Sequence, residues 1–257
     1  MGLKDEPFLE QAPRANGVYL LSDPTPFEAL FARVRAAEMR IRTDAELALI
    51  PDGTGLWNAD EWRLRARGAD RLLHALRPFT SGARLIEVGC GNGWLANKLH
   101  NAGFDVLGID TSTEELEQAV RVFGDGPVFA RADPFDVDLP AHGFDVVVFA
   151  ASFHHFMDAA RTIERAKTFL RPGGEIHILD SILHPSTTEV EKAMERGRLH
   201  YTDLGFPEMA EHCHAHTLRS LQELGAHIRS TPSGMDRTLR RFGREASPFS
   251  HVVLHRQ

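Results

Sequence analysis

The chain has 257 residues, of which 42% are hydrophobic, and it carries a formal net charge of −7. This length is enough for one large α/β domain or for a domain with a cap, and the hydrophobic content supports a substantial core. The acidic balance argues against a general nucleic-acid binder, which usually presents a basic surface.

Two further compositional features bear on location. The two cysteines, Cys90 and Cys213, give no disulfide framework and are typical of a reducing compartment. No apolar run approaches the roughly 18 residues that a membrane span needs, and the first residues lack the apolar core of a signal peptide. We therefore expect a cytoplasmic protein without membrane contact, and we leave its oligomeric state open.

The N-terminal region, residues 1–80, is predicted to form a helical cap or extension. Residues 1–24 look irregular, residues 26–43 have helical periodicity, residues 44–58 form a loop, and residues 59–77 read as a second helix. The apolar side chains that share a face are Phe27, Leu30, Phe31, Val34 and Ile41 on the first helix, and Trp62, Ala66, Ala69, Leu72, Leu73 and Leu76 on the second.

From residue 84 onward, short apolar strands alternate with amphipathic helices. Strands are expected near 84–88, 105–109, 127–131, 144–150, 174–180, 226–231 and 248–254. Helices are expected near 93–102, 112–123, 158–170, 186–203 and 216–224. This alternation predicts a doubly wound α/β fold with a mostly parallel sheet and helices on both faces.

The first predicted strand ends in Glu87 and is followed by Gly89, Gly91 and Gly93, and the second strand ends in Asp110. Glycines let a backbone turn sharply and approach a ligand closely, and an acid at the tip of the second strand can accept hydrogen bonds from ribose hydroxyls. The pattern predicts a nucleoside site. Trp94 stands where the dinucleotide fingerprint G-x-G-x-x-G needs its third glycine, which disfavours an NAD enzyme.

The segment E-V-G-C-G-N-G (residues 87–93) resembles the first motif, E/D-x-G-x-G-x-G, of the class I S-adenosylmethionine (SAM)-dependent methyltransferases. The resemblance runs from about Arg84 to Asp180 and includes residues 132–134, 144–149, 152–156 and the Arg-Pro-Gly-Gly turn at 171–174. It implies SAM as the cofactor and a seven-stranded sheet whose last two strands form a hairpin. The methyltransferase domain would then be residues 81–257, with a substrate-covering insertion near 184–216.

The same resemblance implies which residues hold SAM. Asp110 would bind the ribose hydroxyls, and Asp133 would accept from the adenine amino group while the Phe135 N–H reaches a ring nitrogen. The alternatives are that Asp133 caps a turn, that Thr111 or Ser112 caps the next helix, and that Glu87 orders the glycine turn. The implied cofactor residues are Glu87, Gly89, Gly91, Gly93, Asp110, Thr111, Asp133, Pro134 and Ala150.

Two charged residues fall within the apolar stripes of the cap, Glu38 on the first helix and Arg65 on the second. Burying a charge without a partner is costly. The two residues can pair with each other, or Arg65 can pair with Glu61. Arg65 can also meet the SAM carboxylate, which its guanidinium matches. Arg63, Arg67 and Arg71 lie on the opposite face, where we expect them to be solvated.

Histidines supply the candidate bases, because an unperturbed imidazole titrates near neutral pH. His154 and His155 follow the fourth predicted strand, and His214 lies in the run E-H-C-H-A-H (211–216). Zinc would accept such ligands, but no second ligand pair lies at metal spacing, and no metal is predicted. Tyr201 either binds substrate or packs. The basic run at 237–244 either touches a phosphate or is solvated.

We therefore predict an enzyme that transfers a methyl group from SAM to an oxygen, nitrogen or carbon nucleophile of a small molecule. Binding aligns the donor and the acceptor. His154, His155 or His214 would act where the acceptor proton needs a base. The alternatives are a methyltransferase of tRNA or protein, which needs a basic or groove-shaped docking face, and a non-catalytic SAM-binding sensor.

Overall fold

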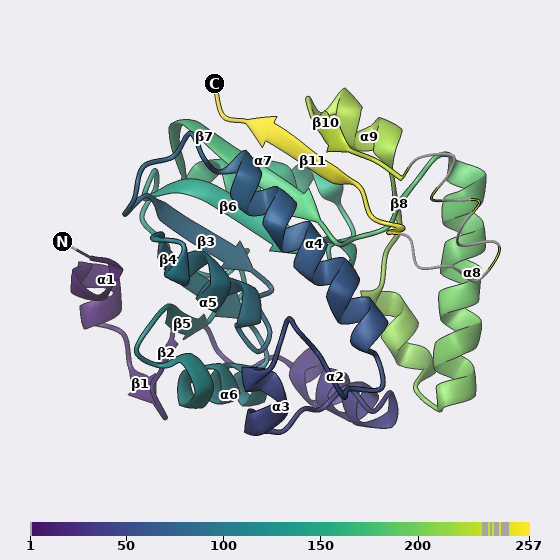
Figure 1. Cartoon of the computed structure of the whole chain (residues 1–257), viewed down its shortest axis with the longest axis horizontal. Coiled ribbons are helices and arrows are strands. Elements are labelled where there is room, and N and C mark those ends of the chain that lie inside the picture. The colour runs from purple at the N-terminus through teal and green to yellow at the C-terminus, as the bar shows by residue number, and fades with distance from the viewer. Residues whose placement is uncertain (1, 233–235, 237, 239–241, 243–246) are drawn as a thin grey trace.

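The computed structural model describes residues 2–232, 236, 238, 242 and 247–257, and these build a mostly parallel sheet flanked by helices (Figure 1). The sheet has nine strands in the order β1-β2-β5-β4-β3-β6-β7-β11-β10. They are β1 (Arg14–Ala15), β2 (Val18–Leu20), β3 (Arg84–Val88), β4 (Asp105–Asp110), β5 (Val128–Arg131), β6 (Phe144–Ala150), β7 (Leu170–Leu179), β10 (His227–Ser230) and β11 (His251–His255).

All seven predicted strands are present, and the final pair, β10 and β11, is antiparallel as expected. The prediction of seven strands in total was wrong, because the N-terminal segment adds β1 and β2 at one edge. β2 pairs in parallel with β5, and β1 pairs back onto β2 through a turn in which Asn16 and Gly17 both have positive φ. Asn-Gly is a strong hairpin signal, and it was missed because the flanking strands are only two and three residues long.

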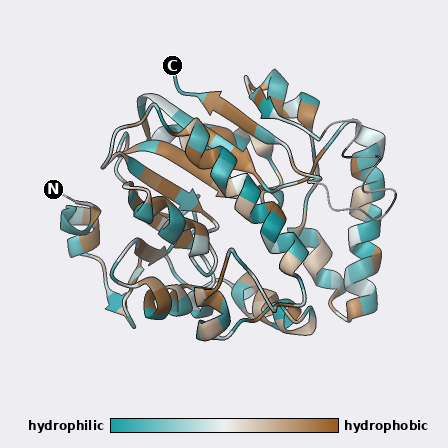
Figure 2. Cartoon of the chain, in the orientation of Figure 1, coloured by the Kyte–Doolittle hydropathy of each residue, from teal (hydrophilic) through white to brown (hydrophobic). Residues whose placement is uncertain are grey.

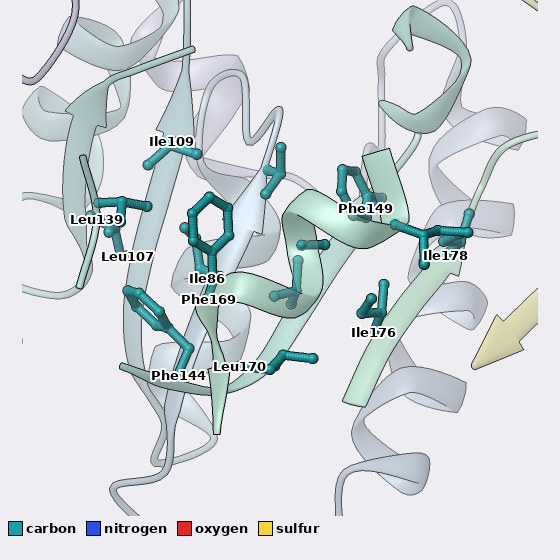
Figure 3. Packing of buried hydrophobic residues seen from close by; sticks show 14 of the residues in the cluster. Ile86, Leu107, Ile109, Leu139, Phe144, Phe149, Phe169, Leu170, Ile176 and Ile178 are labelled. Carbon is teal, nitrogen blue, oxygen red and sulfur yellow. The ribbon is translucent and has the colours of Figure 1, made fainter. Parts of the chain in front are cut away.

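Side chains of alternate residues along the central strands point to opposite faces of the sheet, and each face carries its own apolar core. Ile86, labelled in Figure 3, and Val88 belong to the apolar cluster that includes residues of α7 (Ala159–Phe169) and α9 (Leu218–Glu223). Leu85 belongs to the cluster on the other face. That other face is covered by α4 (Ala59–Ala75), α5 (Trp94–Asn101) and α6 (Thr113–Phe123). In Figure 2 the strands are predominantly hydrophobic and the outer helix surfaces are more polar.

The cap differs from its prediction in two places. The first cap helix, α2 (Pro26–Ala37), ends with Glu38 as its C-cap, so the side chain of Ile41 belongs to no helix face and is 61% exposed. The expected loop contains a short helix, α3 (Asp44–Ala48), because Thr43 and Glu46 form a capping box that satisfies its first N–H groups. Helical periodicity alone did not reveal either boundary.

The segment after β7 projects beyond the sheet. It consists of β8 (Leu183–His184), α8 (Thr187–Leu204), η3 (Pro207–His212) and β9 (His216–Thr217), and β8 pairs in parallel with β9 as a separate two-stranded sheet. Figure 1 shows α8 standing apart from the sheet, beyond the end of α4. The short elements η1 (Leu3–Asp5), α1 (Pro7–Glu10) and η2 (Phe153–His155) complete the described fold. Over the described ranges, none of the helices combines the length and apolar character that crossing a bilayer requires.

Candidate active site

A cavity of about 700 Å³ lies at the carboxyl ends of the parallel strands. The order β4-β3-β6 makes a switch point, because the chain leaves β3 toward one side of the sheet and places β6 on the other. Such points open a crevice for ligands in doubly wound sheets. The lining comes from the glycine turn after β3, from the ends of β4, β5 and β6, and from α2, α4, α8 and η3.

The glycine turn needs glycine for two different reasons. Gly89 and Gly91 line the cavity with φ of 74° and 51°, and a Cβ at Gly89 would overlap the side chain of Ser152. Ser152 donates a hydrogen bond to the Val88 carbonyl at 2.5 Å, which locks the loop after β6 onto this turn. Gly93 does not line the cavity. Glycine is needed there because a Cβ would lie 2.5 Å from the Phe129 ring.

Two acids, the half-buried Asp110 and the buried Glu87, stand at this end of the cavity. Asp110 accepts hydrogen bonds from the Gly91 N–H at 2.7 Å and the Ser112 N–H at 2.9 Å, and burial together with the negative charge of Glu115 raises its pKa to about 6. Burial and the nearby Asp110 charge raise the pKa of Glu87 well above its usual range. The Glu87 Oε2 atom is buried and has no hydrogen-bond partner within the part of the chain that the structure describes.

The first turn of α6 is not capped by the residues that were predicted to cap it. The side chain of Ser112, the N-cap residue, makes no capping hydrogen bond. Asp110 holds the Ser112 N–H, and the α2 residue Glu28 accepts from the Thr113 N–H at 2.7 Å. The cap helix α2 is therefore attached directly to the element that follows Asp110, and Thr111 is left as a lining residue.

The next acid, Asp133, lines the cavity together with Pro134 and Phe135. Its Oδ1 atom accepts a hydrogen bond from the Phe135 N–H at 2.8 Å, which makes a local Asx turn. The Phe135 N–H, which we expected to face a ring nitrogen, is thus already bonded within the chain. The Arg161 guanidinium stacks over the Phe135 ring with its Cζ atom 4.6 Å from the ring centroid.

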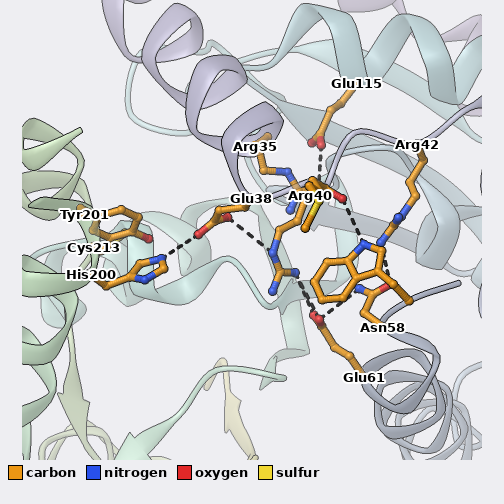
Figure 4. A network of polar contacts seen from close by, with 12 residues as sticks. Arg35, Glu38, Arg40, Arg42, Asn58, Glu61, Glu115, His200, Tyr201 and Cys213 are labelled. Carbon is orange, nitrogen blue, oxygen red and sulfur yellow. Dashed lines mark hydrogen bonds and ion pairs between the residues drawn. The ribbon is translucent and has the colours of Figure 1, made fainter. Parts of the chain in front are cut away.

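A network of charges forms the opposite wall of the cavity (Figure 4). Glu38 pairs with Arg40 at 3.4 Å and His200 at 3.1 Å, and Arg40 also binds Glu61 at 3.1 Å. Arg65 pairs with Glu61 at 2.8 Å, which is one of the two structural pairings that we considered for it. Glu38 and Arg65 do not touch. They are joined through Arg40 and Glu61, so α2, α4 and α8 share one network.

Glu61 is the centre of this network, and its pKa reflects the two arginines that surround it. Burial acts to raise the pKa, but the charges of Arg65 and Arg40 outweigh burial and bring it down to about 2. Further along α4, the Arg71 Nε atom is inaccessible to solvent. The expectation that Arg71 is simply solvated was wrong, because it lies near the buried carboxylate of Asp180 and the buried ring of His251.

The histidines separate into two groups. His154 and His155 line the cavity, whereas His214 does not and instead donates its backbone N–H to the His154 carbonyl at 2.7 Å. Burial lowers the pKa of His154 to about 3 and also lowers that of His155. His155 packs against Phe27 and Phe31 of α2, with ring centroids 5.9 Å away in each case. Both imidazoles are therefore neutral at physiological pH.

The remaining expectations concern Tyr201, Trp94, metal binding and the basic run. Tyr201 lines the cavity, with its hydroxyl 3.3 Å from the Cys213 Sγ, and Trp94 packs edge-on against Trp62. Among the residues with described positions, no three histidine, cysteine or acidic side chains are arranged to hold a metal ion. The basic run 237–244 lies largely outside the described residues.

Sequence patterns did not point to several lining residues. They come from α2, from the loop after it, from the starts of α4 and α6, from the loop after β6 and from η3. A positively charged cluster within residues 35–42, three arginines in eight positions, was the available signal. The missed residues include Phe27, Phe31, Arg35, Arg40, Arg42, Asn58, Glu115, Ser152 and Met209.

Comparison with known proteins identifies the family. Residues 61–228 match the model of a methyltransferase domain. The chain is 36% identical over 154 residues to a 27-O-demethylrifamycin SV methyltransferase of Amycolatopsis mediterranei, and the match spans 56% of each protein. It resembles a Haemonchus contortus phosphoethanolamine N-methyltransferase 2 solved with S-adenosylhomocysteine, with a TM-score of 0.62, 16% identity and coverage of 90% of this chain and 60% of that one.

A similar likeness extends to a magnesium protoporphyrin IX methyltransferase from Synechocystis, also solved with S-adenosylhomocysteine. The TM-score is 0.56 at 18% identity, over 88% of this chain and 94% of that one. At identities this low, the two solved structures establish only the fold. The methyltransferase-domain model covers more than half of the chain and therefore establishes the family. The chain therefore belongs to the class I SAM-dependent methyltransferases and is an enzyme that uses SAM.

Proposed function

We propose that the protein transfers the methyl group of SAM to a protic oxygen or nitrogen of a small molecule held inside the cavity. The observation that carries the proposal is that one cavity is lined by both the acidic glycine turn and two neutral histidines. Its volume of about 700 Å³ suits small ligands, since small-molecule sites usually measure about 300–1,000 Å³. The rifamycin and protoporphyrin relatives, as named, act on small molecules, which supports the same acceptor class.

The residues at the glycine turn fit SAM. Glu87, Asp110 and Glu115 bring three carboxylates to this end of the cavity, and their proximity raises the pKa of Asp110 and of the Cys90 thiol beyond the effect of burial alone. A ligand with a sulfonium and an ammonium group would relieve that repulsion. The unpartnered Glu87 Oε2 offers an acceptor to an ammonium group. Gly89 and Gly91 line the cavity, and their lack of side chains lets the backbone of the turn come close to the ligand.

In this proposal Asp110 accepts hydrogen bonds from the ribose hydroxyls, while Gly89, Gly91 and Ala150 line the methionine and ribose portions. Thr111, Asp133 and Pro134 lie toward the adenine, and Asp133 offers its Oδ2 atom, since the Phe135 N–H donates to Oδ1. Bound SAM supplies an electrophilic methyl group on a positively charged sulfur. The chain itself aligns the acceptor, excludes water with α2 and η3, and holds the acceptor proton.

His155 is the side chain best placed to take that proton. Its Nδ1 atom lies 2.9 Å from the His212 carbonyl, which can only accept, so Nδ1 carries the hydrogen and the lone pair is on Nε2. Burial keeps the ring neutral, as a general base requires. His154, tilted against it with ring centroids 4.2 Å apart, adds a second neutral ring, for which the described residues show no hydrogen bond that fixes the tautomer. His214 has a structural role in this proposal, because its backbone N–H donates a hydrogen bond to the His154 carbonyl.

The test combines binding with product identification. Calorimetry should show micromolar binding of SAM or S-adenosylhomocysteine and no binding of NAD. Incubating the protein with methyl-labelled SAM and small-molecule extracts should yield a labelled product of low mass, and His155→Ala should lose that labelling while still binding SAM. Labelling confined to RNA or protein, or loss of SAM binding in the His155→Ala variant, would contradict the proposal.

A further inference from the structure

Arg42 lies in the loop between α2 and α3 and lines the cavity, yet its side chain is only 8% exposed. Its guanidinium makes one side-chain hydrogen bond, from Nη2 to the Asn58 Oδ1 at 2.6 Å, and lies over the Trp57 ring at 5.9 Å. Both partners are neutral. Within the described ranges no carboxylate lies within 4.0 Å of it, whereas Arg35, Arg40 and Arg65 each have one.

A buried guanidinium without an anion is costly, because the charge loses its water and gains no opposite charge. Burial lowers the pKa of Arg42, and the positive charges of Arg35 and Arg40 lower it further, while the negative charges of Glu46 and Glu61 act to raise it. Among the described residues, the Nε atom of Arg35 is also buried and has no hydrogen-bond partner. The segment 35–42 thus brings three arginines to the cavity wall, and Arg42 is the one that no described carboxylate contacts directly.

The position of Arg42 is fixed before any ligand arrives. Its carbonyl accepts a hydrogen bond from the Gln118 Nε2 at 2.7 Å on α6, and the next residue, Thr43, is the N-cap of α3. Asn58 is itself held, since its amide nitrogen donates to the Glu61 Oε2 at 3.2 Å. A planar fork held at both its backbone and its Nη2 is preorganised for a carboxylate, which binds such a fork through two parallel hydrogen bonds.

We propose that Arg42, together with Asn58, forms a carboxylate-binding subsite in the wall of the cavity. This inference rests on the proposed function and refines it, because the carboxylate belongs either to the methionine part of SAM or to the methyl acceptor. Arg65 does not compete for that role while Glu61 holds it. The subsite makes the cavity selective for a ligand that carries a carboxylate on this side.

The experiment compares the full-length protein with Arg42→Gln, which removes the charge and the fork, and with Arg42→Lys, which keeps only the charge. Arg219→Gln serves as the matched control, because Arg219 is an exposed arginine paired with Glu223 far along the chain. The probes are SAM, decarboxylated SAM, and the pair benzoate and benzamide added to protein saturated with S-adenosylhomocysteine. Melting temperatures establish that each variant is folded.

If the methionine carboxylate occupies the subsite, Arg42→Gln weakens SAM binding about tenfold or more and leaves decarboxylated SAM unchanged, as expected for a lost charged hydrogen bond. If the acceptor supplies the carboxylate, SAM binding is unchanged, wild type binds benzoate in preference to benzamide, and Arg42→Gln abolishes that preference. Either result supports the subsite, and Arg42→Lys should show a smaller loss of the same kind.

The subsite would be overturned if Arg42→Gln binds SAM as tightly as wild type does and also binds benzoate as tightly as wild type does. If Arg42→Gln does not fold, Arg42→Lys takes its place. A folded Arg42→Lys variant that prefers SAM over decarboxylated SAM, and benzoate over benzamide, as strongly as wild type does would also overturn the subsite. Wild type that binds no SAM would instead refute the proposed function, and the subsite would then be judged on benzoate against benzamide alone.

Discussion

The two sides of the cavity are built in different ways. On the glycine-turn side, Glu87, Gly89 and Asp110 lie within 24 consecutive residues and are positioned by adjacent parallel strands. On the cap side, charges from α2, α4 and α8 meet only after folding, and Glu38 and His200 pair across 162 positions. The glycine-turn side depends on backbone shape, so we expect substitutions there to be poorly tolerated. The cap side is a network of ion pairs, in which the loss of one charge leaves its partner bound to another residue.

The largest expected effect is that of Gly89→Ala. Its φ of 74° disfavours any side chain, at a cost of about 1–2 kcal/mol, and overlap with Ser152 adds about 1–3 kcal/mol. We expect a clear drop in melting temperature and loss of SAM binding. Gly55→Ala is the control, because Gly55 has a similar φ of 87° but open space around it. Equal destabilisation by the two variants would show that the contact with Ser152 is unimportant.

Asp110→Asn should have the next largest effect. It removes the negative charge but keeps the shape, so the ribose hydroxyls lose a charged acceptor worth about 1.5–3 kcal/mol per hydrogen bond. Calorimetry should show SAM affinity falling at least tenfold with the fold intact. Asp125→Asn on the surface is the control. Unchanged affinity would mean that Asp110 serves only the Gly91 and Ser112 N–H groups.

The raised pKa of Asp110 predicts a pH dependence of binding. Its pKa is about 6 in the folded free protein, above the ordinary value of 3.8, so the folded state takes up the proton more readily than the unfolded chain. This contribution favours folding below pH 4 and is lost as pH rises through about 6. Ribose binding needs the ionised carboxylate, so SAM affinity should fall as pH drops below 6. Asp180 also has a pKa of about 6, and the Asp110→Asn variant separates the two, since its affinity should lose this pH dependence.

The smallest expected effect is that of Arg65→Met on the cap side. Arg65 and Glu61 are 21% and 25% exposed, and Arg40 still holds Glu61 after the substitution. Solvent screening and this remaining partner limit the loss of stability to about 1 kcal/mol. SAM and decarboxylated SAM should be affected equally, in contrast to Arg42→Gln. A selective loss of SAM binding would assign the methionine carboxylate to Arg65 instead.

Much of the fold could be predicted because its signals are local. Hydrophobic runs of strand length and the glycine turn placed β3, β4 and β6 correctly and identified the strand ends that line the cavity. The Arg-Pro-Gly-Gly segment was expected as a turn before a strand that starts at residue 174, but it lies within β7, which begins at Leu170. The exceptions had specific physical causes. β1 and β2 are too short for periodicity to register, and α2 ends at Ala37 although the apolar spacing continues to Ile41. The assignment of individual residues to SAM stays a prediction.

The sequence by itself determined the doubly wound fold, the acidic glycine turn and the family resemblance, since each follows from neighbouring residues and from the periods of strands and helices. Only the tertiary structure decided how charges from distant segments combine. It joined Glu38 to Arg65 through Arg40 and Glu61, left His214 outside the cavity lining, and left Arg42 buried with no described carboxylate in contact. The reason is that an ion pair depends on the distance between side chains in space, and no periodicity along the chain encodes that distance.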